Sequence, residues 1–184
     1  VLRSPHAHAD IISIDTKTAL NLPGVIGVFT GKGYAEAELG NVAGNSPPKR
    51  RNGEPGFRPP RPAITSDRVH HVGQLIAMVV AETINAAKDA IEAIDVEYKL
   101  LPVNVDPVLN FQPGAPRLWK DCENNEAFFV EKGNPEATTA ALANAKHIVK
   151  NHFVVTRVTA NTLEPRAVVA SYDTCEQHYT VYAC

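Results

Sequence analysis

The chain has 184 residues and a net charge of −2, with 44% hydrophobic and 21% charged residues. These values are typical of one or two globular domains, and they give no electrostatic reason to expect nucleic acid as a partner. No apolar run reaches the roughly 18 residues of a membrane-spanning helix, so no membrane span is expected.

The first 33 residues predict short strands separated by turns. Residues 3–14 are expected to be extended with a bend at Ser4-Pro5, and Asp15 or Thr16 caps a short helical turn. A strand is expected over residues 25–30, after the turn-forming Pro23-Gly24. Residues 31–33 open a short helix or turn, and their glycine spacing does not match a phosphate-binding loop.

Residues 41–62 form a long loop rich in glycine, proline and basic residues. A structureless loop of this length is usually functional or mobile. Its charge raises the hypothesis of an anion-binding site. The simpler alternative is a solvated loop, or a surface that docks on a neighbouring subunit. The basic residues are Lys49, Arg50, Arg51, Arg58 and Arg61.

Residues 72–102 predict a strand, a helix and a second strand in succession. Residues 75–81 are a short apolar run, typical of a strand covered on both faces. Thr83 is expected to cap a helix over residues 84–94, because apolar residues there recur at spacings of three and four. Residues 95–99 alternate as in a half-exposed strand. Helix-on-sheet packing is expected to bury Ile76, Met78, Val80, Ile91 and Ile94.

The remainder of the chain predicts a second α+β region. Linker-like residues 112–116 suggest domains over residues 1–112 and 113–184. Short and long strands are expected over residues 128–130 and 147–156, with a helix from Asn134-Pro135 to Ala145 between them. A hairpin of strands over residues 167–172 and 177–184 follows. Because the last strand runs to Cys184, we expect the second domain to be truncated.

Few residues suggest chemistry by themselves. His6 and His8 would share a strand face, and His70-His71 is a second pair. The two pairs could bind a metal, but no acidic or cysteine ligand stands at a suitable spacing, so hydrogen bonds to backbone in turns are the preferred interpretation. The three scattered cysteines form no CxxC pair, so we expect neither an iron–sulfur nor a zinc site, and a reduced cytoplasmic compartment.

Glu164 and Arg166 place a carboxylate and a guanidinium around a rigid proline. They could hold a loop against a cofactor, or form a salt bridge across a bend. No serine has the context of a nucleophile elbow. From the residues alone, the chain is an α+β protein without a visible catalytic set.

A series of short motifs resembles one protein family. The chain is identified as a member of the molybdenum hydroxylase large subunits, which include xanthine dehydrogenase, aldehyde oxidase and aerobic carbon monoxide dehydrogenase. The matching domain is the N-terminal a/b hammerhead domain. Gly133-Asn134-Pro135 and residues 164–166 resemble the start of the molybdopterin-binding domain. The hammerhead motifs are Arg3-Ser4-Pro5-His6-Ala7-His8-Ala9, Ile14-Asp15, Leu22-Pro23-Gly24-Val25, Val72-Gly73-Gln74, Val96-Glu97-Tyr98, Leu101-Pro102 and Asp106-Pro107.

This resemblance implies a fold and a reaction. The fold would be α+β: a mixed sheet with packed helices, followed by the first strands of a second α+β domain. Family members hydroxylate carbon, or oxidise carbon monoxide, at a molybdenum centre, and iron–sulfur and flavin subunits or domains carry the electrons away. The chain has no Gly-Gly-Phe-Gly or late Gly-Glu segment like those that hold the pterin and supply the base. We therefore assign no catalytic residue, cofactor ligand or metal ligand, and only Glu164 and Arg166 are candidates for lying near the site.

Two hypotheses of different classes remain. In the first, the chain is a portion of a molybdopterin-dependent oxidoreductase large subunit, with a structural role of its own. It would contact the remainder of that subunit and would bind no molybdenum cofactor and show no activity in isolation. In the second, it is a free-standing, non-catalytic binding or interaction module with the same fold, and the loop from Lys49 to Arg61 is its contact surface.

Overall fold

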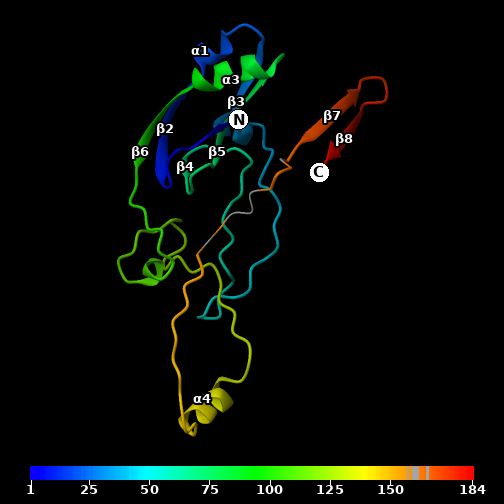
Figure 1. Cartoon of the computed structure of the whole chain (residues 1–184). Helices are drawn as coiled ribbons and strands as arrows, with labels where there is room; N and C mark the ends of the chain where they lie inside the picture. The colour runs from blue at the N-terminus through cyan, green and yellow to red at the C-terminus, as the bar shows by residue number, and fades with distance from the viewer. Residues whose placement is uncertain (157, 159–161, 165) are drawn as a thin grey trace. The chain divides into compact units, whose positions relative to one another are not determined.

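The computed structural model describes residues 1–156, 158, 162–164 and 166–184 and separates into two units, residues 1–132 and 133–184. The first unit carries most of the regular elements (Figure 1). Its strands are β1 (Leu2–Arg3), β2 (Ala9–Asp15), β3 (Val25–Thr30), β4 (Arg68–Val69), β5 (Leu75–Ala81) and β6 (Asp95–Leu100). Its helices are α1 (Lys17–Leu20), α2 (Gly31–Glu36), α3 (Ile84–Glu92) and the 3₁₀ helix η1 (Leu109–Phe111).

Two three-stranded sheets form the centre of the first unit. Their strand orders are β1-β5-β3 and β4-β2-β6, and each of these neighbouring pairs is antiparallel. The expected α+β class is confirmed, and so is the succession of strand, helix and strand. Strands β5 and β6, which flank α3, do not pair with each other and enter different sheets.

Helices α1 and α3 pack side by side against the first sheet (Figure 1). Alanine side chains lie where the two helices meet. Ala19 of α1 and Ala90 of α3 are fully buried in one cluster. Such small side chains let backbones approach closely. Helix α3 begins as expected, because the Thr83 hydroxyl accepts a hydrogen bond from the Ala86 amide at 3.1 Å.

The hydrophobic core consists of two small clusters that meet at β5. One contains Ala77 of that strand with Ile94 and the helix alanines, and the other contains Ile76 with Ala9 and Val69. Consecutive strand residues face opposite sides, so neighbouring side chains of β5 enter different clusters.

Strand β5 is not covered along its whole length on both faces. Ala77 and Val79 face the helices, whereas Met78 and Val80 on the opposite face remain 37% and 38% exposed. The expected burial of Met78 and Val80 is therefore wrong. The reason is that the residues packed on this face bury Ile76 but do not extend to Met78 and Val80. An apolar run in the sequence does not show where such a covering layer ends.

One glycine of α2 is explained by a close backbone contact. A Cβ on Gly31 would overlap the Thr65 carbonyl, so only glycine fits where α2 begins beside residues 65–66. The Thr30 hydroxyl accepts a hydrogen bond from the Gly33 amide at 3.5 Å. Residues 31–33 therefore form the start of a helix that packs against the backbone of residues 65–66.

The second unit contains α4 (Pro135–Ala143) and an antiparallel hairpin of β7 (Val168–Asp173) and β8 (His178–Ala183). The Asn134 side chain caps α4 by accepting from the Ala137 amide at 2.9 Å, as predicted. Across the hairpin, the rings of Tyr172 and Tyr179 are 4.4 Å apart. Every described residue of this unit is exposed.

Two predicted strands do not form. Residues 147–156 are extended without a partner strand, and side chains from both faces are exposed, with Phe153 at 81% and Val154 at 78%. A strand needs a ladder partner, and no described segment supplies one here. Residues 128–130 are also irregular, because they make only an isolated backbone bond, from Phe129 N to Lys49 O at 3.0 Å.

Within the described ranges, no helix has both the length and the apolar character needed to cross a membrane.

Candidate functional site

Glu164 and Arg166, the two residues expected near a cofactor site, are both exposed. The Glu164 carbonyl accepts a hydrogen bond from the Thr162 hydroxyl at 2.9 Å, which is a local turn contact. Pro165, between the two candidates, lies outside the described residues. Their proposed proximity to a cofactor remains a prediction.

The histidines combine differently from their sequence pairs. His6 packs edge-on against Tyr98 with ring centroids 4.8 Å apart. His8 lies 6.1 Å from His70, centroid to centroid, and His70 stacks on Trp119 at 3.7 Å. The sequence placed His6 with His8 on one strand face, but both residues precede Ala9, where β2 begins, and their rings contact different partners.

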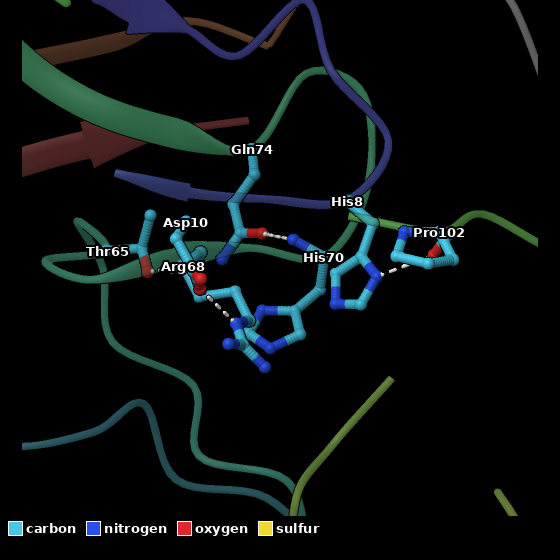
Figure 2. A network of polar contacts seen from close by, with 7 residues as sticks. All are labelled: His8, Asp10, Thr65, Arg68, His70, Gln74 and Pro102. Atoms are coloured by element: carbon cyan, nitrogen blue, oxygen red, sulfur yellow. Dashed lines mark hydrogen bonds and ion pairs between the residues drawn. The ribbon is translucent and has the colours of Figure 1, made fainter. Parts of the chain in front are cut away.

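A network of polar contacts surrounds His8 and His70 (Figure 2). Arg68 Nε donates to Asp10 Oδ1 at 2.6 Å, and the His70 backbone amide donates to Gln74 Oε1 at 2.7 Å. His8 Nδ1 lies 2.9 Å from the Pro102 carbonyl. The backbone contact predicted for the histidines is therefore confirmed for His8.

The two imidazole rings have different surroundings. Because the Pro102 carbonyl can only accept, the His8 ring carries a proton on Nδ1 and donates it to that carbonyl. His8 Nε2 and His70 Nδ1 are both buried without a hydrogen-bond partner among the described residues. Burial, helped by the charges of His8 and Arg68, lowers the pKa of His70 to about 4. His70 is therefore neutral near pH 7.

The ion pair beside the histidines is partly buried. Its side chains are 28% exposed for Asp10 and 18% exposed for Arg68. The hydrogen bond from Arg68 holds the pKa of Asp10 below its usual value, although partial burial acts in the opposite direction. This pair ties β2 to β4 beside their short ladder.

The family-like motifs meet in this same region. Arg3 donates to the Gly73 carbonyl at 2.7 Å. The amide of Ser4 donates to the Gln74 carbonyl at 2.9 Å, and the amide of Gly73 donates to the Ser4 carbonyl at 2.8 Å. Gly73 has a φ of 85°, which favours glycine at this turn. The motif residues therefore hold two distant segments together.

A third motif joins them through backbone. The Leu101 amide donates to the His8 carbonyl at 3.0 Å, which extends the contact that Pro102 makes with the His8 ring. These residues hold one another in position. Among them, no nucleophile, base or acid is directed at a common point.

The basic loop packs on a later segment of the first unit. Phe57 N donates to Ala127 O at 2.7 Å. Arg51 N donates to Glu126 Oε1 at 2.9 Å, and the Arg51 guanidinium lies 4.0 Å from the centre of the Phe129 ring. We call this set of contacts between residues 49–57 and 119–129 the loop clamp.

Cys122 and Arg50 form the buried part of the loop clamp. Arg50 Nη2 lies 3.9 Å from Cys122 Sγ, and Cys122 Sγ donates to the Glu126 carbonyl at 3.4 Å. Burial raises the pKa of the Cys122 thiol, so the thiol stays protonated and unreactive at neutral pH.

Open cavities lie in the described part of the first unit. One of about 640 Å³ is bounded by Arg51 and residues 110–129, and one of about 600 Å³ lies beside Arg68, His70 and Trp119. Another, of about 410 Å³, is bounded by residues 41–43 and 58–61. In the described part of the chain, no group of three or more His, Cys, Asp or Glu side chains is arranged to hold a metal ion.

Several residues of the network escaped the sequence-based prediction. No motif in the sequence points to Trp119, and the Asp10–Arg68 pair spans 58 positions. Gln74 was noted as part of a motif, but its side-chain role was not predicted. A lone polar residue on a half-exposed strand gives no signal of its partner, so only the motif itself could have pointed to this region.

The fold and these motifs define the class of protein. Residues 1–102 match the family described as aldehyde oxidase and xanthine dehydrogenase, a/b hammerhead domain, and residues 119–184 match the molybdopterin cofactor-binding domain. The chain belongs to this aldehyde oxidase and xanthine dehydrogenase family.

Individual relatives agree with the family. The chain is 34% identical to the carbon monoxide dehydrogenase large chain of Afipia carboxidovorans, with 98% of the chain and 22% of that protein covered. It is 30% identical to the nicotine 6-hydroxylase large subunit of Paenarthrobacter nicotinovorans, over 98% of the chain and 21% of that protein.

A solved structure supports the same fold. The chain resembles carbon monoxide dehydrogenase from Oligotropha carboxidovorans with a TM-score of 0.80 and 33% identity, and the match covers 98% of this chain and 23% of the solved chain. The chain thus spans less than a quarter of the length of each of these relatives.

Proposed function

We propose that this chain forms the hammerhead domain and the first strands of the cofactor-binding domain in the large subunit of a molybdenum-dependent hydroxylase or dehydrogenase. It works in the cytoplasm with the remainder of that subunit and with iron–sulfur and flavin subunits or domains. Its own residues have a structural role. The observation that carries this proposal is that the family-like motifs bond to one another: Ser4 to Gln74, Arg3 to Gly73 and His8 to Leu101.

The molybdopterin cofactor implied by the family does not fit the described residues of this chain by themselves. Every described residue of the second unit is exposed, and Glu164 and Arg166 show no ion pair with a described residue. A large organic cofactor needs a site that encloses most of its surface. We therefore assign no reaction step to these residues.

Metal analysis tests the proposal. The 184-residue chain, produced in cells that make the molybdenum cofactor, is expected to contain no stoichiometric molybdenum and to show no hydroxylase activity. The matched control is the full-length subunit from the complete reading frame, expressed in the same cells, which should contain molybdenum. Stoichiometric molybdenum in the 184-residue chain would overturn the structural assignment.

A second measurement separates positioning from catalysis. In the full-length enzyme, Gln74→Ala removes the acceptor for the His70 amide. We expect a lower melting temperature with unchanged kcat per bound molybdenum. An unchanged melting temperature with a large fall in kcat would contradict the proposed role.

The alternative of a free-standing module with the basic loop as its contact surface receives less support. Arg50 and Arg51 already contact the chain's own Cys122, Glu126 and Phe129 within the loop clamp. That half of the loop is occupied internally.

A further inference from the structure

The basic loop divides into two halves with different surroundings. Arg50 and Arg51 belong to the loop clamp. Arg58 and Arg61 are exposed, and neither forms an ion pair with a carboxylate of the described residues. Two cations without a local counterion therefore remain on the second half.

Backbone pairing brings these two arginines to the start of the loop. Asn41 and Pro62 form an isolated antiparallel bridge, and the Val42 amide donates to the Arg61 carbonyl at 2.8 Å. The two ends of the loop thus run side by side. Residues 58–61 lie next to residues 41–44 as a result.

Both guanidinium groups converge on Gly44. A Cβ placed on this glycine would lie 3.3 Å from Arg61 Nη1 and 3.7 Å from Arg58 Nη2, and Arg58 also donates to the Gly44 carbonyl. Like charges repel, so two unpaired cations held around one point are stabilised by any anion placed between them.

The sequence makes this arrangement stiff. Arg58 and Arg61 enclose Pro59-Pro60, and Pro62 follows. Proline fixes its own φ and disfavours the helical region for the residue before it, so the segment favours polyproline II. That helix has three residues per turn, which places Arg58 and Arg61 on the same side. Little conformational entropy is then lost when both contact one ligand.

A small cavity lies at this place. It measures about 410 Å³ and is bounded by residues 41–43 and 58–61, none of which is acidic. The guanidinium group presents planar pairs of N–H donors that match the oxygens of phosphate. We propose that Arg58 and Arg61 form a binding site for a phosphate group, either free phosphate or the phosphoryl group of a small organic phosphate. This inference is independent of the proposed function.

Arginine side-chain NMR tests the site directly. The 184-residue chain, labelled with ¹⁵N, is titrated with inorganic phosphate at constant low ionic strength, with chloride as the balancing anion. The Nε–H signals of Arg58 and Arg61 are expected to shift saturably, with a dissociation constant of about 1 mM, as two charge-assisted contacts would give. Screening by salt should weaken the binding.

Matched variants separate a site from general attraction. The double variant R58Q/R61Q is expected to lose affinity by roughly tenfold or more, because both charged contacts are removed. The control Arg117→Gln removes one positive charge from another exposed arginine, 53% exposed and paired at 3.9 Å with Glu123, and should bind phosphate as the original chain does. Trp119 fluorescence checks that each variant remains folded.

The possible results either support or overturn the site. Saturable shifts that disappear in R58Q/R61Q and persist in R117Q support it. Non-saturable shifts at all arginines, unchanged binding in R58Q/R61Q, or an equal loss in R117Q would overturn it. Glycerol phosphate distinguishes the two sources: binding equal to or tighter than that of phosphate assigns the site to organic phosphates, and weaker binding assigns it to the free ion. A glutamate-rich peptide that binds tenfold tighter than both would overturn the phosphate assignment in favour of a protein partner.

Discussion

Replacement of Ile76 by alanine tests how the first unit is held together. Ile76 is fully buried, and with Val69 it is one of the two largest side chains that are fully buried in the described part of the chain. It fills the cluster that joins β5 to β2 and β4. The variant therefore removes three carbon atoms from the contact between the two sheets.

The expected loss can be estimated from transfer and cavity effects. Three buried carbon groups contribute about 2.4 kcal/mol at roughly 0.8 kcal/mol each. The unfilled cavity adds to this, and such substitutions typically cost about 2–5 kcal/mol. We expect about 3 kcal/mol here, a large part of the roughly 5–15 kcal/mol that stabilises a typical domain.

Urea unfolding followed by tryptophan fluorescence measures this loss. The chain has a single tryptophan, and Trp119 stacks on His70 within the first unit, so its signal reports on that unit. With a denaturant slope of about 2 kcal/mol per molar, the midpoint should fall by about 1.5 M.

The control variant lies on the same strand. Val80→Ala removes two carbons from a side chain that is 38% exposed, and its midpoint should fall by less than about 0.5 M. Equal shifts for Ile76→Ala and Val80→Ala would refute the two-cluster description of β5.

Three further predictions concern the cap of α3 and the polar network. Thr83→Ala removes the acceptor for the Ala86 amide and should lower the free energy of unfolding by about 1 kcal/mol in urea titrations, with Thr83→Ser as the neutral control. The pKa of His70 is about 4 in the folded chain against an ordinary 6.5, so between these values the unfolded chain binds a proton that the folded chain does not. Stability should therefore fall as the pH drops through this window. The variant His70→Phe, which keeps an aromatic ring beside Trp119, should reduce that fall in urea midpoints measured at pH 7 and pH 5. Folding lowers the pKa of Asp10 below 3.8. The pair with Arg68 therefore stabilises the fold above that pH, and this stabilisation is lost as the pH falls through the lower folded pKa. The variant Asp10→Asn should reduce stability at pH 7 and weaken the loss of stability at acid pH, and an unchanged loss at acid pH would contradict the assigned role.

Much of the first unit could be predicted because its signals are local. Thr83 caps a helix whether or not its neighbours are known, and residues 84–94 carry a helical period that the structure bears out over Ile84–Glu92. Asn134-Pro135 begins a helix for the same reason. Periodicity does not show which residues cover a strand or how far they extend. For this reason the sequence wrongly predicted that Met78 and Val80 are buried.

The errors in the second part have the same origin. Residues 147–156 alternate like a half-buried strand, but alternation describes a preference for a sheet and not the presence of a partner. The described residues supply no partner for this segment.

The polar network was only partly predictable. Its members come from positions near 8, 70 and 100, and the contacts form through backbone carbonyls of Pro102 and Ser4 that carry no sequence signal. The motifs indicated that these segments matter, but not that they touch. Long-range hydrogen bonds of this kind depend on the register of strands that pair only in the folded chain.

The loop clamp has a consequence for building chimeras from related enzymes. Residues 119–132 match the cofactor-binding family by sequence, yet they belong to the first unit by contact. An exchange of domains at residues 103–118 would separate Glu126 and Phe129 from the arginine that recognises them. A crossover at residues 132–133 keeps both partners on the same parent, and hybrids joined there should fold where those joined earlier fail.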